Sequence, residues 1–546
     1  MDTDSFEEQL REGEERLARG QAAEAVSCLQ RCVELRPDDA RARLSLGQAL
    51  SESGRDAEAL GQLEQAIALD ASQVRGHIRL GNVLRALSRT GEAVEAYGRA
   101  LELRPADPFI LSNLGNAWLD LGESGRAIDC YRQSLAIYPD APATHSNLIF
   151  ALQYDSRISR EEIAIAHREW GERFGGELAE LAERPEYDGR RPLRVGFLSA
   201  DFRYHPVGRM ASAVWQHLDR ERVTPIVYDN SSDETPTKQR YRGLVERWHN
   251  IAGQLDAEVV QLIRSDRLDV LLDFSGHTSG NRLGVLAQKP APVQATLFGY
   301  PNTTGLSAVD YRITDDVADP AGTESPYVER LYRLPRTAWV YGPPDISPEP
   351  GTLPSLEGKP FTFGCLNNPA KISEAAVRAW SEILQACPES RLLLLVRNDP
   401  AHEGLLLEKF GRHDVDESQL IFAAKGPEPV YLELHNQIDL MLDPFPYNGG
   451  VTTGDCLWMG KPILTLAGDS YVSRQGVGLL AGVGLEEFVA ANREDLVAKA
   501  VGWVAAPGRL AERAAGLQER FQASPQMDHA GYARELESAL REMVTA

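Results

Sequence analysis

The same residues recur every 34 positions through the first part of the chain, and this period constrains the fold more than any other feature. The recurring residues are Gly13, Gly47, Gly81 and Gly115, then Ala25, Ala59, Ala93 and Ala127, then Pro37, Pro105 and Pro139, with Ala71 breaking the last series. Small residues are needed where two helices of a hairpin cross closely, and proline ends a helix because it lacks the backbone N–H. The period predicts stacked helical hairpins, since a plain helical bundle gives three residue types no reason to share one spacing.

This spacing matches the tetratricopeptide repeat, and residues 113–122 are similar to the consensus of that repeat. Four full repeats cover residues 6–141, and a further helix from Thr144 to about Gln153 is expected to cap them. Such repeats bury one continuous core by stacking and present a concave groove to another chain. We therefore expect an α-solenoid over residues 1–153 that binds a protein or peptide.

Beyond Pro192 the pattern changes to short apolar runs separated by helix-length segments. The runs lie at 193–199, 224–228, 268–273 and 293–298, then, after a proline-rich stretch at 342–351, at 361–366, 391–396, 419–423, 438–442 and 462–466. They predict parallel sheets covered by helices. We expect two Rossmann-like domains, over 192–345 and 346–546, after a helical linker over 154–191. Ligands of such sheets bind beyond the carboxyl ends of the strands.

Composition and missing motifs exclude several classes of protein. A net charge of −23 argues against nucleic acid as the main partner, because phosphate binding needs a positive surface. The acidic N-terminus is not a secretory signal, and no apolar run is long enough to span a bilayer. The six scattered cysteines indicate reduced core thiols, so a cytoplasmic protein is expected. The absence of a Gly-x-Gly-x-x-Gly opening and of a P-loop disfavours a dehydrogenase or an ATPase.

The stretch from Asp443 to Trp458 carries the clearest chemical pattern. A buried strand is expected at 438–442, followed by a turn rich in proline and glycine and a helix starting at about Thr452–Thr453. Glycines let the backbone approach a ligand, and the free N–H groups of a helix start favour phosphate. Asp455, one turn later, could hold a ribose. The alternative is an ordinary strand-to-helix turn with threonine caps.

The region from about Arg194 to Val501 resembles the catalytic half of the O-GlcNAc transferases, which are also preceded by tetratricopeptide repeats. The matching segments, in order, are 199–206, 276–280, 290–294, 299–305, 310–315, 371–372, 448–458 and 473–474. The resemblance implies a two-domain glycosyltransferase of the GT-B fold. It also implies inverting transfer of N-acetylglucosamine from UDP-GlcNAc to Ser or Thr of a protein that the repeats recruit.

The resemblance also implies how the departing diphosphate is stabilised, since negative charge builds there in the transition state. Lys371 matches the family lysine that neutralises this charge, so no metal and no cofactor beyond the UDP-sugar donor is expected. The helix start at Thr452 and Thr453 would share the charge, and Asp455 matches the residue used on the ribose. The one Asp-x-Asp spacing of the catalytic half, Asp414-Val-Asp416, fits a solvated loop better than a metal clamp.

Further candidates lie in the first domain and on the nucleotide side. His205 matches the active-site histidine of the family, either as a base for the acceptor hydroxyl or as an orienting group. His277 is weaker, because a histidine satisfying loop hydrogen bonds fits as well. The resemblance implies that the backbone of Phe298 and Gly299 approaches the donor sugar. Asn368 matches a glutamine near the nucleotide.

Two departures from the family leave the donor open. Tyr431 and Leu434 stand where a nucleotide-contacting histidine and a basic residue are usual, and Gly450-Val451 replaces a His-Thr pair. Tyr431 could still stack on a base. The alternatives are a flagellin or adhesin glycosyltransferase with another nucleotide-sugar, a transferase for small molecules or glycans, and a repeat scaffold whose catalytic half has decayed. The acceptor and the oligomeric state stay open.

Overall fold

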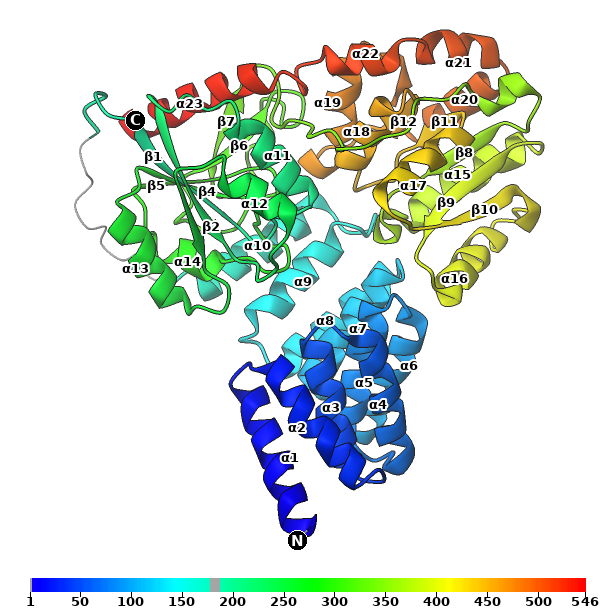
Figure 1. The fold of residues 1–546 in the computed structure, drawn as a ribbon. Coiled ribbons are helices and arrows are strands. Elements are labelled where there is room, and N and C mark those ends of the chain that lie inside the picture. Colours follow the sequence, from blue (N-terminus) through cyan, green and yellow to red (C-terminus); the bar gives the residue numbers. More distant parts are fainter. Residues whose placement is uncertain (1, 177–186) are drawn as a thin grey trace. The chain divides into compact units, whose positions relative to one another are not determined.

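The computed structural model describes residues 2–176 and 187–546 (Figure 1). It divides into two compact units, Met1–Thr144 with Val396–Glu408 and His145–Leu395 with Lys409–Ala546. Part of the expected linker, residues 177–186, lies outside the described residues. No helix of the described residues combines the length and the apolar character that crossing a membrane requires.

The first unit contains four helical hairpins. They are α1 (Asp2–Ala18) with α2 (Ala22–Leu35), α3 (Ala40–Glu52) with α4 (Asp56–Leu69), α5 (Val74–Ala86) with α6 (Thr90–Leu103), and α7 (Pro108–Asp120) with α8 (Ser124–Ile137). The periodic glycines lie where the two helices of a hairpin meet: a Cβ on Gly81 would come within 2.6 Å of Cε1 of Tyr97. A Cβ on Gly115 would meet Tyr131 at the same distance of 2.6 Å. The predicted solenoid of tetratricopeptide repeats is confirmed.

The second unit contains two sheets whose paired strands run parallel. The first has the order β3-β2-β1-β4-β5-β6-β7 and the second β10-β9-β8-β11-β12-β13. The strands of the first sheet are β1 (Leu193–Ser199), β2 (Val223–Asp229), β3 (Arg247–Asn250), β4 (Val270–Asp273), β5 (Val293–Thr296), β6 (Tyr311–Asp315) and β7 (Arg330–Leu334). Those of the second are β8 (Thr362–Cys365), β9 (Arg391–Val396), β10 (Leu420–Ala424), β11 (Leu440–Leu442), β12 (Ile463–Leu466) and β13 (Val489–Ala490). The predicted fold class is confirmed.

Helices connect and cover these strands. Before and within the first sheet they are α9 (Pro142–Leu152), α10 (Arg160–Phe174), α11 (Pro206–Trp215), α12 (Pro236–Arg242), α13 (Asp256–Asp266) and α14 (Leu283–Ala287). With the second sheet come α15 (Glu374–Ala386), α16 (Pro400–Gly411), α17 (Glu428–Glu433), α18 (Val451–Trp458), α19 (Gln475–Gly482), α20 (Arg493–Val504), α21 (Pro507–Ala514) and α22 (Leu517–Gln522). The last helix, α23 (His529–Thr545), packs against α11 and β7 of the first sheet.

The segment before the first strand is part of the core of the first α/β domain. Ile149 of α9 and Trp170 of α10 lie in one apolar cluster with Leu198, Tyr228 and Tyr300. Ser159 caps α10: its hydroxyl accepts a hydrogen bond from the Glu162 N–H, and the Glu162 carboxylate accepts one from the Ser159 N–H. Because their apolar side chains are buried with the sheet, α9 and α10 are built into this domain.

Candidate active site

Two loops at the carboxyl edge of the second sheet bring Lys371 and the start of α18 together. One follows β8 and the other follows β11, and these strands are direct neighbours, with Met441 paired to Gly364. The Lys371 Nζ donates a hydrogen bond of 2.8 Å to the carbonyl oxygen of Asn448, which lies three residues before α18 begins at Val451. The predicted lysine and the predicted helix start therefore share one corner of the sheet.

Lys371 is half-buried beside an aromatic ring. Its Nζ is 4.4 Å from the centre of the Tyr447 ring. Burial lowers the pKa of Lys371 to about 8, because the charged ammonium is poorly solvated there, and Asp443 opposes this shift. An anion beside the ammonium would be bound strongly, since electrostatic attraction grows as water is excluded.

Asp443 holds the turn that leads to α18. Its carboxylate accepts a hydrogen bond of 2.7 Å from the Gly449 N–H and another of 2.7 Å from the Thr465 hydroxyl. Burial raises the pKa of Asp443 to about 7. The Asp443 carboxyl group thus holds the glycine turn in place, and its oxygens already accept hydrogen bonds from the protein.

Helix α18 begins without a side-chain cap. The residue before it, Gly450, offers no capping oxygen. Thr453 is buried, and its hydroxyl donates to the Gly449 carbonyl at 3.0 Å, whereas Thr452 is partly exposed. The alternative interpretation of this segment, an ordinary turn with threonine caps, needs a threonine hydroxyl accepting from the first N–H groups. Since neither threonine plays this part, the N–H groups at the start of α18 remain available to an anion.

Asn367, which sequence reasoning missed, lies at the same corner. It is 1% exposed, and neither its Oδ1 nor its Nδ2 has a geometric hydrogen-bond partner within the described parts of the chain. Buried amides are normally paired, so Asn367 is a candidate for contact with a ligand. The neighbouring Asn368 is engaged locally, because its side chain accepts from the Ala370 N–H at 3.2 Å.

Asp455 lies one turn into α18 and is held by two tyrosines. The hydroxyl of Tyr341 donates to its carboxylate at 2.6 Å and that of Tyr431 at 3.3 Å. Burial raises the pKa of Asp455 to about 6, and Arg209 opposes this shift. Tyr431, one of the departures from the family pattern, thus contacts the residue expected at the ribose. Leu434 lies in the short helical turn that follows.

A second missed group joins the two α/β domains. The guanidinium of Arg209 lies 2.8 Å from the Glu428 carboxylate and donates through Nε to the Gly342 carbonyl at 2.7 Å. The Tyr204 hydroxyl also donates to Glu428. Arg209 is on α11 and Glu428 opens α17, so this cluster connects the helix that follows His205 to the helix that carries Tyr431. The position of Arg209, one helical turn after His205, was the feature of the sequence that could have pointed to it.

His205 caps α11 and is 36% exposed. Its Nδ1 accepts a hydrogen bond of 3.3 Å from the Val207 N–H, and burial lowers its pKa. Because Nδ1 accepts, the neutral ring carries its hydrogen on Nε2 and offers a donor there. This arrangement favours an orienting role over that of a base.

His277 is fully engaged in the protein interior. Its Nδ1 lies 2.9 Å from the Ser146 hydroxyl and its Nε2 lies 2.9 Å from the Thr304 carbonyl. Burial lowers the pKa of His277 to about 4. The contacts agree with a histidine that satisfies loop hydrogen bonds.

Phe298 and Gly299 form a tight turn after β5. Phe298 has a φ of 59°, in the left-handed region that non-glycine residues rarely adopt. A Cβ on Gly299 would lie 1.7 Å from the carbonyl oxygen of Phe274, so only glycine fits. Strain of this kind is typical of ligand-contacting segments.

The Asp-x-Asp segment serves the local backbone. Asp416 accepts from the Ser418 N–H at 2.8 Å, and hydrogen bonds from the Ser418 hydroxyl and then this N–H lower its pKa. Across the described residues there is no group of three or more His, Cys, Asp or Glu arranged to hold a metal ion.

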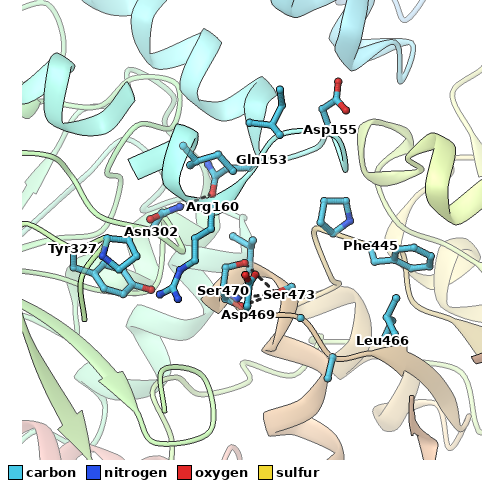
Figure 2. A pocket seen from close by; sticks show the side chains of 17 residues that line it. Gln153, Asp155, Arg160, Asn302, Tyr327, Phe445, Leu466, Asp469, Ser470 and Ser473 are labelled. Atoms are coloured by element: carbon cyan, nitrogen blue, oxygen red, sulfur yellow. Dashed lines mark hydrogen bonds between the residues drawn. The ribbon is translucent and has the colours of Figure 1, made fainter. Parts of the chain in front are cut away.

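A cavity of about 170 Å³ lies beside this corner (Figure 2). Gln153 and Arg160 line it on one side, Asn302 and Tyr327 on another, and Phe445 with residues 466–470, 472 and 473 on the third. None of the predicted site residues lines it. Phe445 is two residues before Tyr447, the ring that Lys371 contacts, so the cavity and the Lys371 corner share one loop.

Comparisons with known proteins agree with this architecture. Residues 176–343 and 355–536 match Glycosyl transferase family 41, and residues 10–74, 81–122 and 108–141 match tetratricopeptide repeats. The two catalytic stretches make up more than half of the chain. The protein belongs to glycosyl transferase family 41.

Its relatives include several named transferases. The chain is 35% identical over 418 residues to the probable UDP-N-acetylglucosamine–peptide N-acetylglucosaminyltransferase SPINDLY of Solanum lycopersicum, covering 73% of this chain and 44% of that protein. It is 29% identical over 324 residues to the probable enzyme SEC of Arabidopsis thaliana, covering 57% and 33%. The chain therefore spans less than half the length of these curated relatives.

One solved structure is similar along almost its whole length. It is a mutant of the O-GlcNAc transferase of Thermobaculum terrenum, with 30% identity and a TM-score of 0.85, covering 92% of this chain and 97% of that one.

Proposed function

We propose that this protein is an inverting, metal-independent glycosyltransferase that moves N-acetylglucosamine from UDP-GlcNAc to Ser or Thr of a protein bound by the repeats. The observation that carries the proposal is the half-buried Lys371 beside the uncapped start of α18. The names of the relatives and the repeats in front of the catalytic half support the donor and the protein acceptor.

The proposed reaction is a single displacement. The acceptor hydroxyl attacks the anomeric carbon from the face opposite the diphosphate, the glycosyl–oxygen bond breaks, and the nucleoside diphosphate leaves with both electrons while the hydroxyl proton is released. Lys371 and the first N–H groups of α18 would meet the charge that develops on the leaving oxygen. His205 would donate from Nε2 to orient the sugar or the acceptor, and Asp455 would accept from the ribose.

The identity of the nucleotide-sugar donor depends on the residues around the nucleotide. Tyr431 contacts Asp455, and Glu428, which opens the same helix, is neutralised by Arg209. Leu434, at the position where the family pattern carries a basic residue, supplies no charge to the nucleotide side. A different nucleotide-sugar, as in transferases acting on flagellin or adhesins, is the alternative that this observation favours.

A thermal-shift experiment separates these possibilities. A ligand that binds only the folded protein raises the melting temperature. At a ligand concentration of a hundred times the dissociation constant, it adds about 2.7 kcal/mol to the free energy of unfolding. We expect UDP-GlcNAc to give the largest shift in a panel of UDP-, GDP- and dTDP-sugars, and Lys371→Met to reduce it. A larger shift with another donor would transfer the proposal to that sugar, and no shift with any member would favour a decayed scaffold.

The cytoplasm is the proposed compartment. All six cysteines are buried and free, which is typical of proteins kept in a reducing environment.

A further inference from the structure

The inner helices of the first three repeats line a groove with an uneven distribution of charge. It has a volume of about 760 Å³ and is lined from α1, α3 and α5. Apolar side chains, among them Leu44 and Ile78, alternate there with three arginines, Arg41, Arg75 and Arg79. The chain as a whole carries a net charge of −23, so a group of cations in one groove departs from the general character of the protein.

The three arginines differ in how far they are neutralised. Arg41 is paired with Glu14 of the same groove, with Nε 2.9 Å from the carboxylate. Arg79 has only a long contact of 3.6 Å with Glu52 and stays 39% exposed. Arg75 is exposed and has no ion pair with any of the described residues. The positive charge available to a ligand is therefore concentrated in the third repeat.

The repeat period fixes the pattern that a bound chain would meet. Arg41 and Arg75 occupy the same position of successive repeats, and so do Leu44 and Ile78. In the fourth repeat this arginine position is taken by Phe109, which is 67% exposed and 6.0 Å from the Tyr138 ring. Cations in the second and third repeats are thus followed by an exposed aromatic residue in the fourth.

We infer that this groove selects acceptor proteins through an extended acidic segment that has an apolar residue at one end. Arg75 and Arg79 bind its carboxylates, Leu44 and Ile78 contact the side chains between them, and Phe109 receives the apolar residue. Guanidinium groups suit this role because they bind carboxylates in a planar, two-point manner. The inference rests on the proposed function, because it names the class of acceptor that the transferase would modify.

Local contacts can outweigh the net charge of the protein. At physiological ionic strength, interactions between exposed charges are screened beyond about 8 Å. The distant carboxylates of the protein then repel an acidic segment weakly, whereas the groove arginines contact it directly.

Peptide binding to the full-length protein tests the inference. Three fluorescein-labelled peptides of equal length are compared by anisotropy at physiological salt: one alternating Glu with Leu and ending in Phe, one with Gln for Glu, and one with Lys for Glu. We expect the acidic peptide to bind about tenfold more tightly than the Gln peptide, as follows from two carboxylate contacts of ordinary strength. Equal binding of the acidic and Gln peptides, or tighter binding of the Lys peptide, would overturn the inference.

Charge reversal locates the binding. The double variant Arg75→Glu with Arg79→Glu is expected to abolish the preference for the acidic peptide. The matched control is Arg99→Glu, on α6 of the same repeat, where the guanidinium is 68% exposed and paired with Glu102 outside this groove. Should the double reversal lower the melting temperature, Arg75→Gln with Arg79→Gln replaces it. A preference that survives the groove variants, or is lost in Arg99→Glu, contradicts the assignment to this groove.

The donor-induced shift in melting temperature, measured on the same preparations, separates the two proposals. A donor shift without an acidic preference leaves the transferase proposal standing and removes the groove inference. An acidic preference without any donor shift leaves the binding of acidic segments standing, and removes the transferase proposal together with the role of the groove in acceptor selection.

Discussion

Replacing Lys371 by methionine separates a catalytic lysine from a structural one, because the two roles predict opposite effects on stability. Methionine keeps the length of the side chain and removes the charge. The lysine is half-buried, and loss of solvation lowers its pKa from the usual 10.5 to about 8. At pH 7, below both values, the ammonium is charged in the folded and unfolded states alike, so its burial costs about 3 kcal/mol of folding stability.

The substitution removes this cost and introduces smaller ones. It breaks the hydrogen bond from Nζ to the Asn448 carbonyl, which contributes about 1 kcal/mol. It also takes from Asp443 the neighbouring cation that lowers the pKa of its carboxyl group. The melting temperature is therefore expected to stay unchanged or to rise.

Turnover is expected to fall sharply in the same variant. Losing one preorganised electrostatic partner of a developing charge costs about 10²–10³ in turnover, or about 2.7–4 kcal/mol. Nucleotide affinity should fall less, because the start of α18 and Asp455 still contribute to binding. Release of the nucleoside diphosphate from the donor measures turnover, and a thermal scan measures stability.

Lys461 provides the matched control for this experiment. It is fully buried in the same domain, its pKa is likewise lowered to about 8, and its Nζ donates to the Gly351 carbonyl at 3.0 Å. Lys461→Met should keep near-normal turnover. Near-normal turnover with a lowered melting temperature in Lys371→Met would make Lys371 a structural residue and refute the reasoning.

Three further predictions follow from the same contacts. As pH rises through about 8, kcat/KM should fall, because the ammonium of Lys371 that attracts the donor loses its proton in the free enzyme; a flat profile up to pH 10 measured by nucleotide release would contradict this. Turnover should survive excess chelator and the change Asp414→Asn, and loss of activity that Mg²⁺ or Mn²⁺ restores would show that a metal takes part. Gly81→Ala should cost about 1–3 kcal/mol of stability, since its Cβ would come within 2.6 Å of the Tyr97 ring. The control Gly98→Ala, whose Cβ would meet no atom within 4 Å, should be neutral or stabilising. Equal melting temperatures of the two variants would disprove a close helix crossing at Gly81.

The two edge regions of the first sheet mark a limit of sequence reasoning. The apolar runs predicted β1, β2, β4 and β5, but not β3, β6 or β7. In β3 and β7 charged and polar residues are frequent, as in Arg247–Asn250 and Arg330–Leu334. Both are edge strands, which bury less of their surface and therefore carry a weaker apolar signal. These two segments become strands because they pair with β2 and β6 in the folded sheet.

The candidate site was predictable where its pattern is local. The turn from Asp443 to Thr453 follows from a short stretch of sequence, whereas Lys371 was singled out by the resemblance to the family. Asn367, Arg209 and Glu428 were not found, because nothing near them in the sequence indicates their partners. Arg209 meets Glu428 only because α11 and α17 come together in the folded chain.

By itself the sequence determined the repeat solenoid, the two parallel α/β domains and the loop that would bind a diphosphate, because helix crossing, strand burial and glycine turns depend on neighbours along the chain. Only the tertiary structure decided which polar groups are free to act. It occupies His277 and Thr453 with backbone partners, buries the Asn367 amide without a geometric hydrogen bond to the described parts of the chain, and lowers the pKa of Lys371 by removing water around it. The reason is physical: hydrogen-bond satisfaction and solvation depend on atoms brought close in space, and the sequence pattern does not record that proximity.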